Sequence, residues 1–166
     1  MTRHLSDVTV ELFAAYDVTI EPCSATTCGP ESETYCMASI GYVGDGVRGA
    51  LVLAAPQAVA EAWTQAAGGA ECDFADTLGE FSNMLLGRLK GRLLCEGITI
   101  GLATPMTVTG GGLRFSLAPG QSSWQFFQGR GWRLGTRLDA AFEAGFERRT
   151  TTDDAQPADA GDAILF

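Results

Sequence analysis

The chain has few basic residues. Eleven Lys and Arg stand against twenty Asp and Glu, and the formal net charge of the 166 residues is −9. Because proteins that bind nucleic acid neutralise phosphates with Lys and Arg, no nucleic-acid partner is expected. No apolar run reaches the roughly 18 residues of a membrane-spanning helix, and the first residues lack an apolar signal segment. These absences predict a cytoplasmic protein that does not enter a membrane.

Metal-binding residues are also scarce. The five cysteines include no Cys-x-x-Cys pair, and the only histidine, His4, lies near a terminus that we expect to be mobile. Because a zinc site needs about four ligands at suitable spacings, no metal site is predicted. An odd number of cysteines in a cytoplasmic chain favours reduced thiols, with Cys36 in a strand and Cys95 packed at a helix end.

The apolar content, in contrast, is ample for a hydrophobic core at 46% of residues. Periodicity, glycines and prolines predict an α/β alternation of the α+β kind, in which most strands are antiparallel. The expected helices cover residues 5–16, 56–67 and 72–95, and the expected strands cover residues 18–23, 35–42, 47–54, 98–103, 106–109, 124–128 and 132–142. We expect two long helices to pack on one face of the sheet.

The composition changes near the end of the chain. Residues 1–149 have the length and apolar content of one domain with one core. Residues 150–166 are small, polar and acidic apart from the last four, Ala163 to Phe166. Such a segment has little to bury, so we expect a disordered tail.

The segment 72–95 contains the most informative pattern. Apolar residues recur at spacings of three and four, which places them on one side of a helix: Leu78, Phe81, Leu85, Leu89 and Leu93. Four other residues fall together on the opposite, solvent side: Asp76, Glu80, Asn83 and Gly87. Most polar helix faces only keep a protein soluble. Asn and Gly are poor helix formers, however, and this leaves a functional face as the alternative interpretation of the pattern.

The helix and the segment after it carry a family resemblance. Glu80-Phe-Ser-Asn83-Met-Leu-Leu-Gly87 resembles the Glu-x-x-Asn signature of the chemotaxis phosphatases, the family of CheC, CheX and FliY. The following strand, which ends at Pro105, also resembles the family pattern. Twenty-one residues separate Asn83 from Pro105, one fewer than in that pattern. The resemblance implies a CheC/CheX-like fold over roughly residues 5–146.

The resemblance also implies an activity and a partner. Members of the family remove phosphate from the aspartyl-phosphate of a CheY-like receiver domain. By carry-over, Asn83 would position the attacking water and Glu80 would pair with a lysine of the receiver. A neutral amide can donate and accept hydrogen bonds without adding a charge that repels phosphate. No cofactor of this chain is expected, since the receiver would supply its own Mg²⁺.

Three further residues are candidates for binding the receiver. Gly87 leaves a flat patch on the helix that a partner's backbone could approach closely. Asp76 has two interpretations, because an acid near a helix start favours the helix dipole and can cap amides, or could contact the receiver. Pro105 has a structural interpretation as well, since proline ends or shapes an edge strand.

A faint internal repeat suggests a single site. Asp7 to Ala14 matches Asp76 to Asn83 in spacing, but Ala14 replaces the amide. The family is built on a pseudo-twofold of such units, and some members carry two active helices. One intact helix fits a CheX-like member, for which the resemblance also makes a homodimer plausible.

Two other functions remain open at this stage. The chain could be a non-catalytic receiver-binding or dimerisation scaffold of the same fold. It could also be a small-molecule sensor, which would need a roomy apolar pocket with a few polar groups. The intact Glu80 and Asn83 favour the enzyme.

Overall fold

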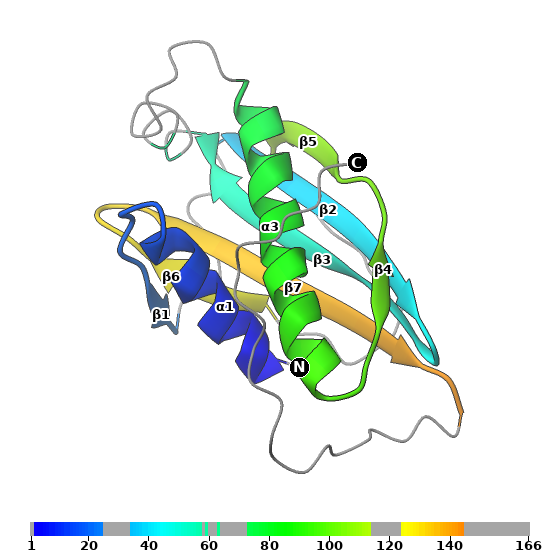
Figure 1. Ribbon diagram of the computed structural model, residues 1–166. Helices are drawn as coiled ribbons and strands as arrows, with labels where there is room; N and C mark the ends of the chain where they lie inside the picture. The colour runs from blue at the N-terminus through cyan, green and yellow to red at the C-terminus, as the bar shows by residue number, and fades with distance from the viewer. Residues whose placement is uncertain are drawn as a thin grey trace.

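The computed structural model describes residues 2–24, 34–57, 59, 63, 73–113 and 124–144 (Figure 1). Its two described helices are α1 (Thr2–Ala14) and α3 (Phe74–Cys95). The strands are β1 (Glu21–Cys23), β2 (Thr34–Gly44), β3 (Val47–Pro56), β4 (Ile100–Leu102), β5 (Met106–Gly111), β6 (Trp124–Gln128) and β7 (Arg133–Phe142). None of the described helices is long and apolar enough to cross a membrane.

The strands form one seven-stranded sheet in the order β1-β6-β7-β3-β2-β4, with β5 also paired to β2. Every pair is antiparallel, which confirms the predicted strand arrangement. The hairpin of β2 and β3 turns at Asp45 and Gly46, and Gly46 has a positive φ of 72°, a conformation that glycine adopts readily. Strands β4 and β5 lie one after the other along the same edge of β2.

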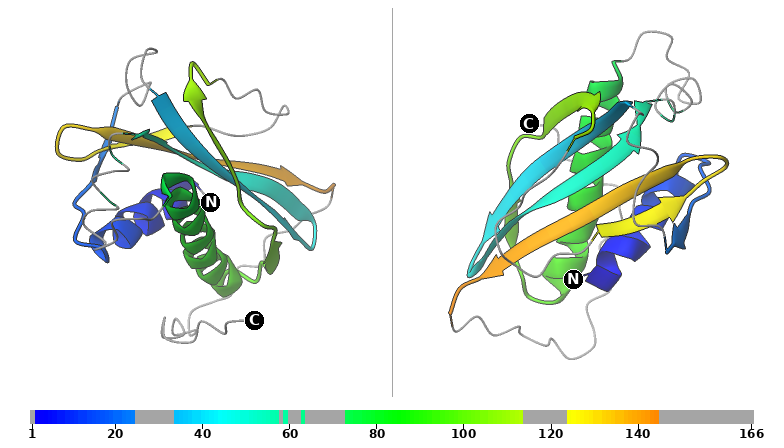
Figure 2. Two further views of the ribbon diagram at one scale, coloured as in Figure 1. Left: turned by 90° about the horizontal axis from the view of Figure 1, so that it is seen from above. Right: turned by 180° about the vertical axis from the view of Figure 1, so that it is seen from behind.

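Both helices cover the same face of the sheet (Figure 2), as the sequence predicts. Alternate residues of the central strands point toward the helices and are buried, for example Ile40 in β2 and Leu51 in β3. They meet the apolar stripe of α3, of which Leu85 and Leu89 are fully buried. The core therefore fixes the rotation of α3 about its own axis, and with it the residues that α3 shows to solvent.

Helix α3 has well-defined ends. The Asp73 carboxylate accepts a hydrogen bond of 2.9 Å from the amide of Ala75, so Asp73 is the N-cap. At the other end, Gly97 has a φ of 75° and the amide of Ile98 returns to the carbonyl of Leu93. This is a glycine-ended C-cap.

The two helices run antiparallel and contact each other along their length. Near the start of α1, His4 Nε2 lies 2.6 Å from Glu96 Oε1, just after α3. Near the end of α1, the Tyr16 hydroxyl donates to the sulfur of Met84 at 3.2 Å. The expectation of a mobile terminus is therefore wrong for His4, because the helix that begins at Thr2 carries it to the end of α3.

The structure corrects three other details. Pro56 is the last residue of β3, paired with Tyr35, rather than the first residue of a helix. The strand predicted over 18–23 is reduced to Glu21–Cys23. Cys95 is exposed rather than packed.

Other predictions concern the cysteines and the segments outside the described residues. Cys36 is buried in β2 as expected, and burial raises the pKa of its thiol. The helix predicted over 56–67 falls mostly outside the described residues. The same holds for the tail at 150–166.

Candidate active site

The four residues predicted to share the outer face of α3 are all exposed: Asp76, Glu80, Asn83 and Gly87. The five residues of the predicted apolar stripe are all buried, together with Gly79, Ser82 and Leu86. The helical interpretation of this segment is therefore confirmed residue by residue. Spacings of three and four residues put the four exposed positions one above the other over three turns.

The acid and the amide at the centre of this face are available to a partner. Glu80 and Asn83 are three residues apart, so their side chains leave neighbouring points on the helix surface. Among the described residues, neither side chain has a hydrogen-bond or ion-pair partner. The arrangement offers one carboxylate and one carboxamide to a partner, with no side-chain contact to another described residue to break before binding.

Pro105 borders this face on the side of strand β5. A Cβ placed on Gly79 would lie 3.9 Å from Pro105 Cγ and 3.5 Å from Thr107 Cγ2. Gly79 is one helical turn before Asn83, so the chain between β4 and β5 passes close to the face that carries the amide. The structure thus brings Pro105 near the α3 candidates, although this contact alone assigns it no function. The structural interpretation of Pro105 also fits, since it separates two edge strands that both pair with β2.

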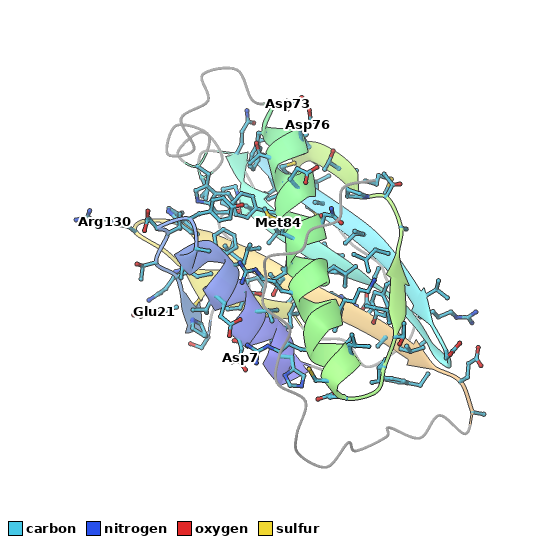
Figure 3. All side chains as sticks on the ribbon, viewed as in Figure 1. Asp7, Glu21, Asp73, Asp76, Met84 and Arg130 are labelled. Atoms are coloured by element: carbon cyan, nitrogen blue, oxygen red, sulfur yellow. The ribbon has the colours of Figure 1, made fainter. Side chains whose placement is uncertain are left out.

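Tyr16 borders the same face on the side of α1. Its hydroxyl contacts Met84, and its ring lies 5.0 Å from the ring of Phe81 between centroids. Figure 3 labels Met84 near the middle of α3 and Asp76 in its first turn. Nothing in the local sequence singles out Tyr16, because a contact over 68 positions leaves no mark in local periodicity.

Asp76 is not the cap of α3, because Asp73, three positions before it, takes that role. Asp73 caps the helix, and Asp76 follows in the first turn, where an acid still favours the dipole of the helix. The Asp-x-x-Asp spacing is a signal that could have located the cap from the sequence. Asp76 remains exposed on the same face as Glu80.

No cluster of three or more metal-ligating side chains occurs among the residues that the structure describes.

Comparison with known proteins gives the family. The family described as chemotaxis phosphatase CheX matches residues 36–127, which include the whole of α3 and Pro105. The chain belongs to the CheX family. No curated protein sequence matches the chain.

Solved CheX structures share the fold. CheX from Vibrio vulnificus is 21% identical with a TM-score of 0.67, over 84% of this chain and 93% of that chain. CheX from Desulfovibrio desulfuricans is 18% identical with a TM-score of 0.71, over 84% and 97%. The CheX of a Borrelia burgdorferi CheX–CheY–BeF3–Mg complex is 14% identical with a TM-score of 0.68, over 84% and 96%. At these identities the likeness establishes the CheC/CheX-like fold.

The α1 helix of this CheX-family chain carries the counterpart of the α3 face. Asp7, Glu11 and Ala14 are exposed at the spacing of Asp76, Glu80 and Asn83. Glu11 is engaged with α3, because its Oε1 lies 2.5 Å from Arg92 Nη2. The α1 face thus lacks the amide, and its acid already has a partner.

Proposed function

We propose that this protein accelerates the dephosphorylation of an aspartyl-phosphate on a CheY-like receiver domain. The observation that carries the proposal is the exposed Glu80–Asn83 pair on α3, in a chain that belongs to the CheX family. The CheX–CheY complex from Borrelia burgdorferi, whose CheX shares the fold, supports a receiver as the partner.

The proposed role of Asn83 is to position water. An aspartyl-phosphate is an activated acyl phosphate, so hydrolysis mainly requires a nucleophile that is held in line with the phosphorus. A carboxamide can accept a hydrogen bond from the water and donate one to a phosphoryl oxygen. Some GTPases position their attacking water with an amide in this way. Orientation alone can remove several kcal/mol of an activation barrier, and Asn83 adds no repelling charge.

The proposed role of Glu80 is to hold the receiver in register. Its carboxylate would pair with a receiver lysine, one helical step from the amide. A charge pair across an interface sets orientation and partner choice more than raw affinity. In this scheme Glu80 is a partner-binding group that places Asn83, and it takes no proton from the attacking water.

The remaining candidates would shape the docking surface. Gly87 has open space where a Cβ would be, with no atom of the described chain within 4 Å, so a receiver backbone could come close to α3 there. Pro105 lies close to Gly79 and would form one border of the surface. Asp76 would contribute a second acid toward a basic patch of the receiver. The Mg²⁺ that assists the reaction would belong to the receiver.

We also propose that each chain has one active face and that the protein is cytoplasmic. A homodimer is compatible with this scheme. The α1 face lacks the amide and its Glu11 is held by Arg92.

The runner-up function is a scaffold of the same fold that binds a receiver, or another copy of this chain, without hydrolysis. The wild type would then accelerate phosphate release from no receiver, and Glu80 and Asn83 could be replaced without consequence.

The test is phosphate release from a panel of phosphorylated receivers of the host, with the wild type beside Asn83→Ala and Glu80→Ala. Asn83→Ala should lose roughly a hundredfold in turnover, as when a single positioned hydrogen-bonding group is removed from an active site. It should still bind the receiver, whereas Glu80→Ala should weaken both binding and turnover. Asp45→Ala, a change of an exposed acid in the turn between β2 and β3, is the control away from α3 and should keep full activity.

One outcome would decide against the enzyme, and another against the role of Asn83. If the folded wild type accelerates no receiver of the panel, the phosphatase is refuted and the scaffold is favoured for any receiver that binds. If one receiver is accelerated equally by the wild type and by Asn83→Ala, the activity stands but the role of Asn83 does not.

A further inference from the structure

Tyr16 is a large aromatic side chain that stays 44% exposed although it is in contact with the core. Its ring packs at 49° on Phe81, which belongs to an aromatic cluster with Phe13 and Trp63. Its hydroxyl lies 3.2 Å from the sulfur of Met84. Phe81 and Met84 thus support the Tyr16 ring, and the rest of the ring is exposed to solvent.

The backbone around Tyr16 is fixed as well. The amides of Tyr16 and Val18 both return to the carbonyl of Phe13 at 3.0 Å, which closes the end of α1. Asp17 between them has a φ of 59°, a left-handed conformation that glycine adopts far more readily than aspartate. The ring is therefore ordered before any partner arrives, and binding to it costs little additional side-chain entropy.

The position of Tyr16 relative to the candidate site follows from its two contacts on α3. Met84 is one turn after Glu80 and next to Asn83 in the chain, and Phe81 directly follows Glu80. A side chain that touches both Phe81 and Met84 lies along the α1 side of the outer face, beside Glu80. Pro105 borders the face on its other side, near Gly79.

We propose that Tyr16, supported by Met84, is an apolar anchor for the receiver domain beside the Glu80–Asn83 pair. The inference rests on the proposed function, because it assigns an added contact to the same partner. Tyrosine and methionine are enriched in the cores of protein interfaces, and a few such anchors carry most of the binding energy. If Glu80 pairs with a receiver lysine, the exposed Tyr16 ring is placed to receive the alkyl stem and charge of that lysine.

The anchor should act on affinity and leave the chemical step unchanged. Tyr16→Ala should raise KM for the phosphorylated receiver about tenfold at unchanged kcat, an effect typical of truncating an interface anchor. Tyr16→Phe keeps the ring and should stay within about twofold of the wild type, because the proposed contact is apolar. Met84→Gln keeps the length of the side chain but adds a polar end, and should also raise KM.

Leu94→Ala is the matched control. Leu94 is another exposed apolar residue on α3, 58% exposed and just over three turns beyond Asn83, so its truncation should leave KM unchanged. Binding of a beryllofluoride-loaded receiver, measured for the same variants, separates this inference from the proposed activity. Tyr16→Ala should weaken that binding about tenfold, with helical circular dichroism unchanged.

Each outcome of these measurements supports or overturns the anchor, the phosphatase or both. A wild type that hydrolyses the phosphoryl group, beside a Tyr16→Ala variant with unchanged KM and binding, overturns the anchor and leaves the phosphatase intact. A wild type that binds without hydrolysis, with weaker binding by Tyr16→Ala, supports the anchor and refutes the phosphatase. Equal loss in Tyr16→Phe and Tyr16→Ala overturns the claim that the ring is the anchor. A wild type that neither binds nor hydrolyses any receiver overturns both.

Discussion

Glu11 of α1 and Arg92 of α3 form an ion pair, with 2.5 Å between Glu11 Oε1 and Arg92 Nη2. The pair joins the helix that has Ala14 three residues after its acid to the helix that has Asn83 three residues after Glu80. Both acids are exposed, but Glu11 is paired across the two helices, whereas Glu80 has no partner among the described residues. The two acids therefore differ in their physical role despite their matching spacing.

Removal of this ion pair should have a small effect on stability. Both side chains remain about half exposed, at 46% for Arg92 and 45% for Glu11, and exposed pairs contribute roughly 0–1 kcal/mol. We expect Arg92→Ala to lower the free energy of unfolding by no more than about 1 kcal/mol, measured by urea denaturation, with phosphate release unchanged. A large loss of activity at normal stability would mean that the α1 face takes part in function.

Two glycines on α3 provide a matched pair for testing the docking surface. Neither Gly87 nor Gly91 has any described atom within 4 Å of an added Cβ, and both lie inside the helix. Each change to alanine should stabilise the fold by up to about 1 kcal/mol, because glycine is the poorer helix former. Only Gly87→Ala should raise KM for the phosphorylated receiver.

Thermal unfolding and receiver kinetics on both variants check this prediction. An unchanged KM in Gly87→Ala would show that no partner backbone comes close to α3 at that point. An equal rise in KM for Gly91→Ala would move the docking surface further along the helix.

The sequence predicts α3 well because the signal is local. Burial of one stripe and exposure of the opposite one depend only on the helical period, so the places of Glu80 and Asn83 follow once the helix is recognised. The error at Cys95 has the same local origin. Cys95 lies two residues, or about 200° around the helix, beyond Leu93 and therefore off the buried stripe.

The two borders of the candidate site were not predictable in this way. Pro105 approaches Gly79 because β4 and β5 both pair with β2, which lies beneath α3, and nothing near either residue specifies that pairing. Tyr16 reaches Met84 because the helices run antiparallel on one face. Pro56 shows tertiary structure overriding a local preference, since pairing with Tyr35 retains it in β3 although proline suits a helix start.

Gly49 should tolerate no side chain. A Cβ there would lie 1.8 Å from the carbonyl oxygen of Asp139 and 2.6 Å from the hydroxyl of Tyr42. Gly49→Ala should therefore force β3 and β7 apart, with a loss of about 1–3 kcal/mol or more in the free energy of unfolding. Gly111→Ala in β5, where an added Cβ meets no described atom within 4 Å, is the control and should change stability by less than about 0.5 kcal/mol. Chemical denaturation of both variants gives the comparison, and equal stabilities would contradict the close approach at Gly49.

Tyr42 should make stability depend on alkaline pH. Its hydroxyl donates to the carbonyl of Asp139 at 2.8 Å, and burial, with a smaller contribution from the charge of Asp139, raises its pKa well above the usual value. The folded state therefore keeps the phenol protonated at a pH where the unfolded chain releases that proton, near pH 10. The stabilisation is fully present below about pH 10 and is lost as the pH rises toward the folded-state pKa.

Tyr42→Phe isolates this contribution, because it removes the titrating hydroxyl and keeps the ring. At neutral pH the variant should be less stable than the wild type by about 0.5–1.5 kcal/mol through the lost hydrogen bond. Above about pH 10 the difference should shrink, since the wild type alone loses the protonation-linked part of its stability at this residue. Urea unfolding of both proteins between about pH 8 and pH 11 measures the difference, and subtraction cancels the titration of lysines and other tyrosines. A difference that stays constant across this range would show that Tyr42 titrates alike in the folded and unfolded chains, and that its burial beside Asp139 does not hold the proton.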